Sequence, residues 1–322
     1  DKLLQLMVQK NGSDLFITAD APPSMKVNGT IMPVTKSALT PEQSMTLVKS
    51  VMTPSQIKEF DETLECQFAI SDKHQDARFR VSAFVQKDCA GMVLRKIETK
   101  IPTVEQLNLP PILNEIAMKK QGIVLLVGAT GTGKSTTLAA MMGYRNENSR
   151  GHIITIEDPI EYVHEHKGCI ITQREVGIDT KSFEAGLKNT LRQAPDVILI
   201  GEIRTRETMD YAIQYAETGH LVFATLHANN ANQAIDRIIH FFDAEHHEQI
   251  LMDLSLNLHA IVAQQLIATP DGKGRRAAIE ILLNSQLIGD YIRKGEVHEI
   301  KPVMKRSREL GMQTFDQALF DL

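Results

Sequence analysis

The sequence predicts an α/β protein with two parts, a smaller mixed α/β domain followed by a larger domain built on a mostly parallel sheet. Three observations support this. The chain has 322 residues, more than the roughly 100 to 200 residues of a typical single domain. Apolar strand-like runs alternate with helical segments after residue 122, which favours a parallel sheet. A glycine-rich motif at residues 128–135 stands between one such run and a helix.

The first part is predicted at residues 1–98. Its strand-like segments are residues 15–18, 25–27, 67–70, 79–85 and 92–95. Asn28 and Gly29 form a hairpin turn signal, and Thr40 before Pro41 marks the start of a short helix. Prolines and a lack of hydrophobic period predict a linker at residues 99–112. The second domain then covers residues 113–322.

In the second domain, residues 123–127, 153–156, 197–200 and 221–226 are the predicted strands. We also expect a hairpin near residues 169–172 and a helix with Phe183, Leu187 and Leu191 on one face. Beyond residue 230 the chain is predicted to be mainly helical, an addition to the sheet. One hairpin interrupts it, with its turn at residues 271–274 between residues 263–268 and 277–283.

Composition narrows the classes of function. The net charge of −5 and the pI near 6.1 argue against general binding to nucleic acid. Cys66, Cys89 and Cys169 form no CxxC pair, which argues against a structural zinc site and fits a reducing cytoplasm. The apolar runs are far shorter than the roughly 20 residues that span a bilayer. Because the chain starts at Asp1 without an initiator methionine, we expect the natural N-terminus to lie upstream.

Residues 128–135, Gly-Ala-Thr-Gly-Thr-Gly-Lys-Ser, match the phosphate-binding pattern G-x-x-x-x-G-K-[ST]. Glycines permit backbone conformations in which successive N–H groups converge on phosphates at the positive end of a helix. We expect Lys134 to reach the β- and γ-phosphates of ATP and the Ser135 hydroxyl to ligand Mg²⁺. The predicted nucleotide-binding residues are Gly128, Ala129, Thr130, Gly131, Thr132, Gly133, Lys134, Ser135 and Thr136.

Hydrolysis also needs carboxylates beside the phosphates. Glu157 follows a predicted strand, at the edge where open parallel sheets hold their ligands, and is the best candidate for the general base. Glu202 follows the apolar strand at residues 197–200 and is the candidate Walker B acid, holding Mg²⁺ partly through water. Glu161 is a third candidate. The alternative for each acid is a solvated or helix-capping carboxylate.

His220 and His227 bracket the predicted strand at residues 221–226. Their odd separation would point them to opposite faces of a regular strand, which argues against a two-histidine metal site. Each is either a sensor of the γ-phosphate or a structural residue with satisfied hydrogen bonds. The sequence leaves both interpretations open.

Four motifs in this order resemble the secretion and pilus ATPases of the RecA-like superfamily, in particular the PilT/PilU retraction ATPases of type IV pili. Residues 128–135 resemble the Walker A motif of that family, 155–161 its Asp box, 196–204 its Walker B motif and 218–227 its His box. Residues 13–15 and 78–84 resemble its N-terminal PAS-like domain. The resemblance covers nearly the whole chain. It implies a RecA-like P-loop ATPase core with a smaller PAS-like α/β domain.

The resemblance also implies partners and further site residues. It implies a cytoplasmic homo-hexamer at the inner membrane, with a PilT-like paralogue and an inner-membrane pilus platform protein as partners. ATP and Mg²⁺ are the expected cofactors, without zinc or nucleic acid. Arg80 and Arg95 correspond to arginines that reach toward bound nucleotide in the family. Without the resemblance, both would be interpreted as solvated charges on the outer face of a sheet.

Departures from the family pattern indicate the accessory, PilU-like branch. Gly289 stands where a PilT motif has arginine, and Arg204 is followed by Thr205 rather than by aspartate. Extension ATPases commonly carry a four-cysteine zinc site, which three cysteines cannot supply. An extension or type II secretion ATPase remains an alternative. A nucleotide-binding module that docks on a PilT ring is another, and a RecA-like DNA motor is a third.

Overall fold

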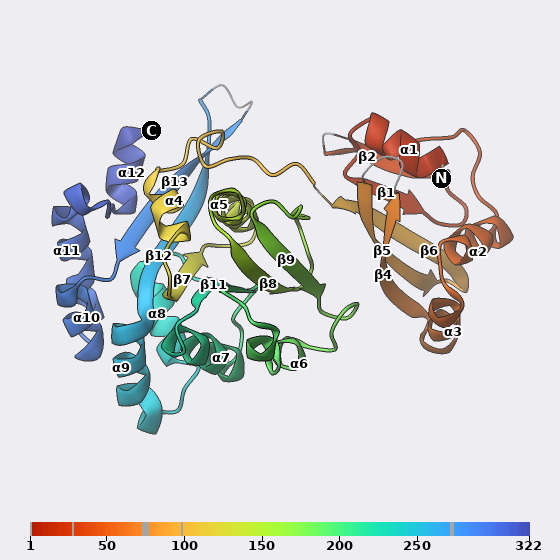
Figure 1. Cartoon of the computed structure of the whole chain (residues 1–322). Coiled ribbons are helices and arrows are strands. Elements are labelled where there is room, and N and C mark those ends of the chain that lie inside the picture. Colours follow the sequence, from red (N-terminus) through yellow and green to blue (C-terminus); the bar gives the residue numbers. More distant parts are fainter. Residues whose placement is uncertain (1, 28, 73–76, 98, 271–273) are drawn as a thin grey trace. The chain divides into compact units, whose positions relative to one another are not determined.

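The structure is a computed structural model that describes residues 2–27, 29–72, 77–97, 99–270 and 274–322. It divides into two compact units, Asp1–Lys100 and Ile101–Leu322, each of which is described by itself (Figure 1). Throughout the described ranges, no helix combines the length and the hydropathy that crossing a bilayer would require.

The first unit is one antiparallel sheet with three helices. The strand order is β3-β2-β1-β6-β5-β4. The strands are β1 (Asp14–Ile17), β2 (Ser24–Val27), β3 (Thr30–Pro33), β4 (Glu65–Asp72), β5 (Ala77–Gln86) and β6 (Cys89–Ile97). The helices are α1 (Lys2–Gln9), α2 (Pro41–Ser50) and α3 (Pro54–Thr63). All five predicted strand segments are confirmed, whereas α1, α3 and β3 were not predicted.

Local chemistry explains where α2 and α3 begin. Thr40 and Thr53 each cap a helix that has proline at its first position, and each forms a reciprocal capping box with a glutamine three residues on. The helix predicted to start after Thr40 is therefore confirmed. Of the predicted hairpin signal, Asn28 lies outside the described residues. Strands β2 and β3 on either side of it pair antiparallel, with Val27 opposite Thr30.

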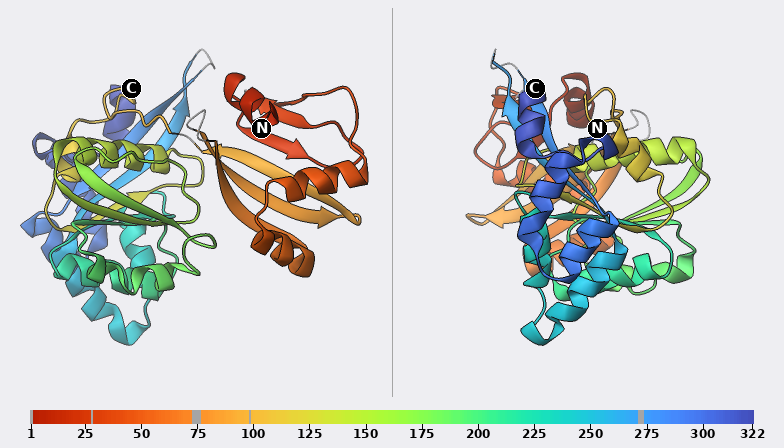
Figure 2. Two further views of the ribbon diagram at one scale, coloured as in Figure 1. Left: turned by 45° about the vertical axis from the view of Figure 1, so that its right-hand side comes forward. Right: turned by 90° about the vertical axis from the view of Figure 1, so that its left-hand side faces the viewer.

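The second unit is a seven-stranded sheet in the order β13-β12-β7-β11-β10-β8-β9. Figure 2 shows the ribbon of this unit in two further views, with helices on both sides of the sheet. All neighbouring strands run parallel except β12 and β13, which form an antiparallel pair. The strands are β7 (Gly122–Val127), β8 (Gly151–Glu157), β9 (Cys169–Glu175), β10 (Val197–Ile200), β11 (Leu221–Leu226), β12 (Leu258–Ala268) and β13 (Arg275–Leu283).

Helices cover both faces of this sheet, as the continuous apolar runs of the central strands require. The α-helices are α4 (Ile112–Ala117), α5 (Lys134–Asn148), α6 (Phe183–Leu187), α7 (Arg206–Glu217), α8 (Ala231–Ile239), α9 (His247–Asn257), α10 (Gln286–Arg293), α11 (Ile300–Arg306) and α12 (Phe315–Asp321). Short 3-10 helices are η1 (Thr190–Gln193), η2 (Ala244–His246), η3 (Val297–Glu299) and η4 (Arg308–Leu310). Successive residues of β7 show the two layers: Leu126 packs in the core that includes α4 and α5, and Leu125 in the core that includes α7, α8 and α9.

Three predictions for this unit need correction. The segment at residues 169–172 is not a hairpin, because β9 pairs parallel to β8. The predicted helix through Leu191 stops after α6 and becomes the short η1. The C-terminal part is not only a helical addition, because β12 lies directly beside β7 in the sheet. The turn predicted at residues 271–274 lies outside the described residues except for Gly274.

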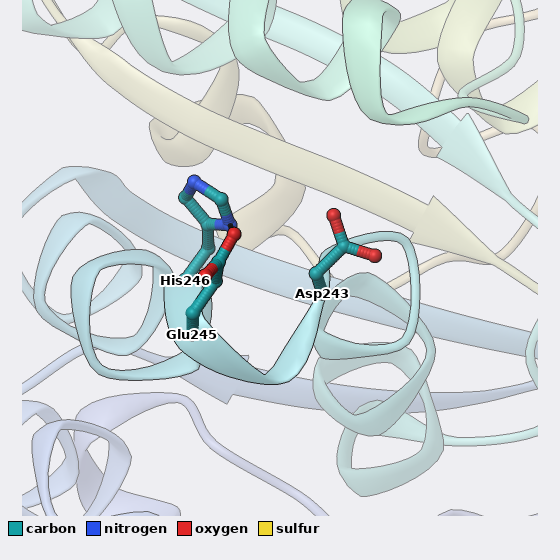
Figure 3. A group of neighbouring side chains, drawn as sticks. All are labelled: Asp243, Glu245 and His246. Carbon is teal, nitrogen blue, oxygen red and sulfur yellow. Dashed lines mark ion pairs between the residues drawn. The ribbon is translucent and has the colours of Figure 1, made fainter.

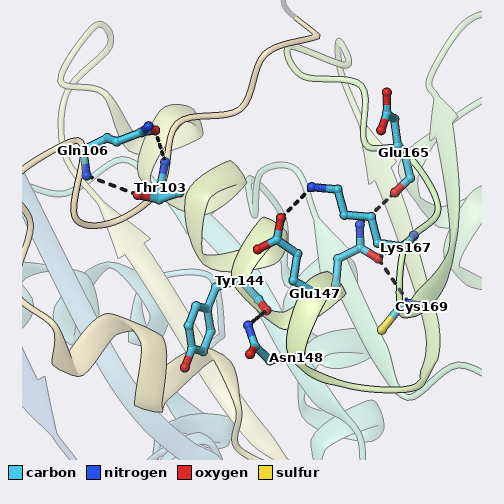
Figure 4. Close-up of polar contacts among 9 residues, drawn as sticks. Thr103, Gln106, Tyr144, Glu147, Asn148, Glu165, Lys167 and Cys169 are labelled. Atoms are coloured by element: carbon cyan, nitrogen blue, oxygen red, sulfur yellow. Dashed lines mark hydrogen bonds and ion pairs between the residues drawn. The ribbon is translucent and has the colours of Figure 1, made fainter.

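The segment predicted as a linker packs largely on the second unit. The two units divide after Lys100. Val104 and Leu109 are buried in the same apolar cluster as α4 and α5. The amide and hydroxyl of Thr103 exchange hydrogen bonds with Gln106, forming a capped turn (Figure 4). Burial of these side chains fixes residues from 101 onward to the sheet.

The C-terminal end of α5 anchors the loop that leads from β8 into β9 (Figure 4). The buried side chain of Asn146 donates to the carbonyl of Glu165 at 2.7 Å and accepts from the amides of Lys167 and Cys169, each at 3.2 Å. Lys167 also forms an ion pair with Glu147 at 2.5 Å. These contacts hold the loop at residues 158–168 against the helix that follows the phosphate-binding motif.

Candidate active site

The phosphate-binding motif forms the turn between β7 and α5, in the predicted strand-loop-helix context. A Cβ on Gly128 would lie 2.7 Å from the carbonyl oxygen of Gln264, so only glycine fits there. Gly133 takes a left-handed conformation, with φ of 86°, at the N-cap of α5. No side chain caps this helix. The amides of its first turn are therefore available to an anion, and the helix dipole favours negative charge there.

Lys134 is folded over the loop that precedes it. Its Nζ donates to the carbonyl oxygens of Gly128 and Ala129, both at 2.8 Å, and the residue is 9% exposed. Burial lowers the pKa of Lys134, while the nearby carboxylates of Glu202 and Glu161 oppose this effect. The ammonium group therefore lies in the loop among acceptors that a phosphate oxygen can replace.

Strand β12 contacts the helix that follows the phosphate-binding loop. The hydroxyl of Thr137 donates to Oε1 of the buried Gln264 at 2.7 Å, and Thr132 donates to the carbonyl of Ala129 at 2.9 Å. Thr136, next to Ser135, lies 2.9 Å from the hydroxyl of Tyr162, hydroxyl to hydroxyl. The loop is thus held from the sheet on one side and from the segment after β8 on the other.

Glu157 is the last residue of β8, at the same edge of the sheet as the end of β7. Its Oε1 accepts hydrogen bonds from Thr155 Oγ1 at 2.6 Å and from Gln173 Nε2 at 3.2 Å. Burial raises the pKa of the Glu157 carboxyl to about 7, and these two hydrogen bonds act in the opposite direction. A carboxyl that titrates near neutrality is suited to accept a proton during hydrolysis.

Glu202 lies just after β10 and is already paired. Arg204 contacts its Oε2 at 2.6 Å, and His227 Nε2 lies 3.1 Å from its Oε1. The backbone at Gly201, just before Glu202, passes close to the end of β8: a Cβ there would lie 3.0 Å from the Cα of Glu157. The side chain of Glu202 is 16% exposed. Its carboxylate is therefore accessible from the cavity while its charge is balanced.

These groups surround one cavity of about 620 Å³, a size typical of small-molecule sites. Its lining residues come from the phosphate-binding loop and the start of α5, from the ends of β8, β10 and β11, from the loop before β9 and from the start of β13. They include Thr130, Gly131, Gly133, Lys134, Ser135, Thr136, Glu157, Glu161, Tyr162, His164, Glu202, Arg204, His227 and Arg275. The structure thus brings together the phosphate-binding loop and the three predicted acids.

The two predicted histidines separate. His227 lines the cavity and contacts Glu202. His220 precedes β11 at the opposite edge of the sheet, where its Nδ1 lies 3.1 Å from the carbonyl oxygen of Tyr215 and 3.1 Å from Thr218 Oγ1. Six strand residues separate the two positions, about 20 Å. Within one chain, His220 is therefore not placed at the cavity, and its surroundings are those of a structural histidine.

Arg80 and Arg95 lie in the first unit, directly opposite each other on β5 and β6. Like charges facing each other across strands are unfavourable. Here Asp14, opposite Arg95 on β1, accepts from Arg95 Nε at 2.8 Å, and Arg80 donates to Gln67 at 3.0 Å. The Arg95 side chain is 73% exposed. The pair thus forms a row of charge on the outer face of the sheet.

A second group of polar side chains lies away from this cavity. Asp243, Glu245 and His246 gather at the turn before α9, with potential ligand atoms within 4.8 Å of one another (Figure 3). Asp243 also lies 3.6 Å from the guanidinium of Arg206. The two acidic side chains are about 80% exposed, so water solvates them fully. We assign no metal to this group.

Several residues that line the cavity or support its walls were not predicted from the sequence. Thr155 could have been predicted, because residues two apart in a strand lie on the same face, and Thr155 therefore shares a face with Glu157. Gln173 and Gln264 could not be predicted from the sequence, because their roles depend on the pairing of β9 with β8 and of β12 with β7. His164 also lines the cavity, and burial lowers its pKa to about 4, with Lys167 adding to the effect.

Comparison with known proteins agrees with this geometry. The family model for "Type II/IV secretion system protein" matches residues 1–315. The chain belongs to this family. It is 69% identical over all of its 322 residues to the type IV pilus ATPase PilU of Pseudomonas aeruginosa, of which it covers 84%. It is 41% identical, over 99% of the chain and 92% of the relative, to the PilT retraction ATPase of the same species.

Solved structures of the family share the fold. A crystal structure of the pilus retraction motor PilT with bound ADP superimposes with a TM-score of 0.88 at 37% identity, covering 98% of this chain and 95% of that one. The ATPase DotB of Legionella pneumophila gives a TM-score of 0.81 at 26% identity, covering 99% and 94%. The chain is therefore a nucleotide-binding ATPase of the PilT/PilU group, with the predicted RecA-like core and smaller N-terminal domain.

Proposed function

We propose that this chain is one subunit of a hexameric ring whose ATP hydrolysis powers or assists type IV pilus retraction. The observation that carries the proposal is the meeting of Lys134, Glu157 and Glu202 at one edge of the parallel sheet, around a single cavity. The names of its relatives, PilU and PilT, support the link to type IV pili. A type II secretion protein E aligns over only 52% of the chain, so extension and secretion are less well supported.

Different residues of the cavity have different proposed roles in hydrolysis. The free amides at the start of α5 and the ammonium group of Lys134 hold the phosphates. Glu157 accepts the proton of the attacking water. A carboxyl with a pKa of about 7 is suited to this role near neutral pH. Tyr162 and His164 close the side of the cavity next to α5. Each of these roles is a proposal that substitution of the residue tests.

Ser135 and Glu202 are the proposed ligands of Mg²⁺, Glu202 partly through water. A hydroxyl and a carboxylate are the hard oxygen donors that this ion prefers. When bound, the ion would supply positive charge to the phosphates. Arg204 balances the charge of the Glu202 carboxylate, whose side chain is only 16% exposed, and His227 Nε2 contacts the other oxygen of this carboxylate. Glu161 is exposed at the cavity and adds negative charge near Lys134.

Arg80 and Arg95 remain proposed nucleotide-contacting residues on the basis of the family resemblance. An arginine that stabilises a transferring phosphoryl group contributes about 10³ to 10⁵ in rate. The two arginines lie opposite each other on β5 and β6, so both side chains occupy the same face of this sheet. Replacing both by alanine should reduce turnover while leaving the ATPase unit folded. Unchanged turnover would remove them from the site.

The proposed partners are a PilT-like paralogue and the inner-membrane pilus platform protein, at the cytoplasmic face of the inner membrane. The test is complementation: a strain lacking this gene receives either the wild-type chain or Lys134→Ala, with Lys301→Ala on the exposed face of α11 as a matched control. We expect wild type and the control to restore pilus retraction and Lys134→Ala to fail. Full retraction with Lys134→Ala would show that its own hydrolysis is dispensable, as for a docking module.

A further inference from the structure

Gln173 on β9 lies directly opposite Thr155 on the parallel strand β8. Side chains opposite each other in a sheet share a face, and Glu157 follows Thr155 by two residues on that same face. Both Thr155 and Gln173 donate to one atom, Oε1 of Glu157, at 2.6 and 3.2 Å. One oxygen of the proposed base is therefore fixed from two neighbouring strands.

The same amide group also holds the loop after β8. Gln173 Nε2 donates to the carbonyl oxygen of Tyr162 at 2.9 Å, and its Oε1 accepts from the amide of His164 at 2.8 Å. With the bond to Glu157, both N–H groups and the carbonyl oxygen of this side chain are used. Gln173 is thus the one residue that contacts both the loop and the carboxyl of Glu157 in these bonds.

The loop in turn contacts the helix that begins in the phosphate-binding motif. The Tyr162 hydroxyl lies 2.9 Å from Thr136 Oγ1, one residue beyond the proposed Mg²⁺ ligand Ser135. A continuous set of contacts therefore runs from Thr136 through Tyr162 and Gln173 to Glu157. A displacement of Thr136 on α5 would act on Tyr162 through this contact, and through the shared amide of Gln173 it would act on the carboxyl of Glu157.

We propose that Gln173 is a positioning residue for ATP hydrolysis, which orients Glu157 and links that orientation to the contact between Tyr162 and the phosphate-binding helix. The proposal rests on the assignment of Glu157 as the base. Displacement of a reacting group by about 1 Å reduces a rate by about 10²-fold, so a residue that touches no phosphate can still control turnover. Gln173 contacts no reacting atom itself and acts through Glu157.

The charged groups around Glu157 define what a pH profile reports. The carboxylates of Glu161, after β8, and Glu175, on β9, both face it and raise its pKa, as burial does. Lys134 on α5 and Glu202 after β10 line the same cavity. Gln173 opposes the carboxylates, because its N–H stabilises the ionised form of Glu157. Removal of this donor should raise the pH at which Glu157 loses its proton.

The test compares the full-length chain with Gln173→Met, which keeps the length of the side chain and removes the amide, and with Gln173→Glu, which keeps an acceptor for His164 and removes both donors. Thr172→Val is the matched control, because Thr172 is the neighbouring residue on β9 and its hydroxyl contacts His152 instead. For each, kcat is measured from pH 5.5 to 9, together with the Kd of a fluorescent ADP analogue. Glu157→Gln is measured alongside.

We expect both Gln173 variants to lose about 10- to 100-fold in kcat, with the nucleotide Kd within about threefold of wild type. The midpoint of the acidic limb of the kcat profile should move to higher pH by about half a unit or more. The shift should be larger for Gln173→Glu, because this variant adds a carboxylate beside Glu157. Thr172→Val should match wild type. Wild-type kcat in either folded Gln173 variant, or a loss with an unmoved acidic limb, would overturn the proposal.

The variant Glu157→Gln distinguishes a failure of the positioning role of Gln173 from a failure of the assignment of Glu157 as the general base. If Glu157→Gln is inactive and the Gln173 variants behave like wild type, only the positioning role fails. If Glu157→Gln retains turnover, the base itself is wrongly assigned, whatever Gln173 does.

Discussion

The guanidinium of Arg204 lies 2.6 Å from Oε2 of Glu202, so the proposed Walker B carboxylate is already paired with a cation. If Mg²⁺ binds Glu202 as proposed, the ion shares this carboxylate with the arginine. The Arg204 side chain is 60% exposed, and ion pairs of that exposure contribute at most about 1 kcal/mol. Competition of this size corresponds to about a fivefold change in affinity.

Arg204→Ala should therefore lower the Mg²⁺ concentration that gives half-maximal ADP binding by about two- to fivefold. The measurement is a titration of a fluorescent ADP analogue at several Mg²⁺ concentrations. Arg192→Ala, an exposed arginine away from the cavity, serves as the control. The shared-carboxylate account would be contradicted if Arg192→Ala lowered this Mg²⁺ concentration as much as Arg204→Ala does. It would also be contradicted if Arg204→Ala needed a higher Mg²⁺ concentration than wild type.

The pH dependence of turnover should show the ionisation of Glu157. Burial raises the pKa of this carboxyl to about 7, and a general base acts only when deprotonated. We expect kcat to rise as pH increases through about 7 and to level above it. Turnover measured from pH 5.5 to 9 checks this, and a flat profile across that range would exclude Glu157 as the base.

The same group should weaken the fold at alkaline pH. Its ordinary pKa is 4.5, and in the folded chain it is about 7. The folded state therefore binds this proton more tightly, and the resulting stabilisation is present below pH 4.5 and lost as pH rises through 7. Ionised Glu157 then costs on the order of 3 kcal/mol, since each pKa unit corresponds to about 1.4 kcal/mol.

Glu157→Gln, which stays neutral, should therefore raise the free energy of unfolding of the nucleotide-free chain at pH 8 and change it less at pH 5. Thermal melts at the two pH values measure this, with an expected rise in Tm of a few degrees at pH 8. Glu161→Gln is the comparison: Glu161 is exposed at the same cavity, and its charge raises the pKa of Glu157 less than burial does, so this variant should give a smaller rise in Tm. Equal shifts for both variants would argue against a burial penalty at Glu157.

His227 and His220 should differ in their effect on the cavity. His227 contacts Glu202 at 3.1 Å, whereas His220 lies at the opposite edge of the sheet. We expect His227→Ala to weaken Mg²⁺-dependent nucleotide binding by severalfold, and His220→Ala to leave the Kd within about twofold. Calorimetric titration of each variant with ADP and Mg²⁺ gives both values. Equal losses in both would mean that the cavity extends to a second chain.

The sequence predicted the parts of the site that depend on local pattern. Residues 128–135 are recognisable because strand, glycine-rich loop and helix are continuous in the chain. Glu157 and Glu202 were placed correctly at one edge because parallel strands end together. For His220 the sequence left a γ-phosphate sensor and a structural residue open, and the structure favours the second, because six strand residues carry His220 to the other end of β11.

Long-range pairing limited the remaining predictions. Gln173 follows Thr155 by 18 positions, and only the parallel pairing of β9 with β8 brings them opposite each other. The sequence around Cys169 suggested a hairpin, because nothing local distinguishes an antiparallel from a parallel neighbour. Gln264 likewise reaches Thr137 only because β12 inserts beside β7. Such residues are found from the register of the sheet and not from motifs.

The central claim is that the cavity at Lys134 hydrolyses ATP, and the most direct test is the turnover of the purified chain against Lys134→Ala. Steady-state release of phosphate from Mg·ATP is measured for both, with Lys301→Ala as the control for loss of one positive charge. We predict a loss of at least about 100-fold in Lys134→Ala and wild-type turnover in Lys301→Ala. Equal turnover in wild type and Lys134→Ala would contradict the account.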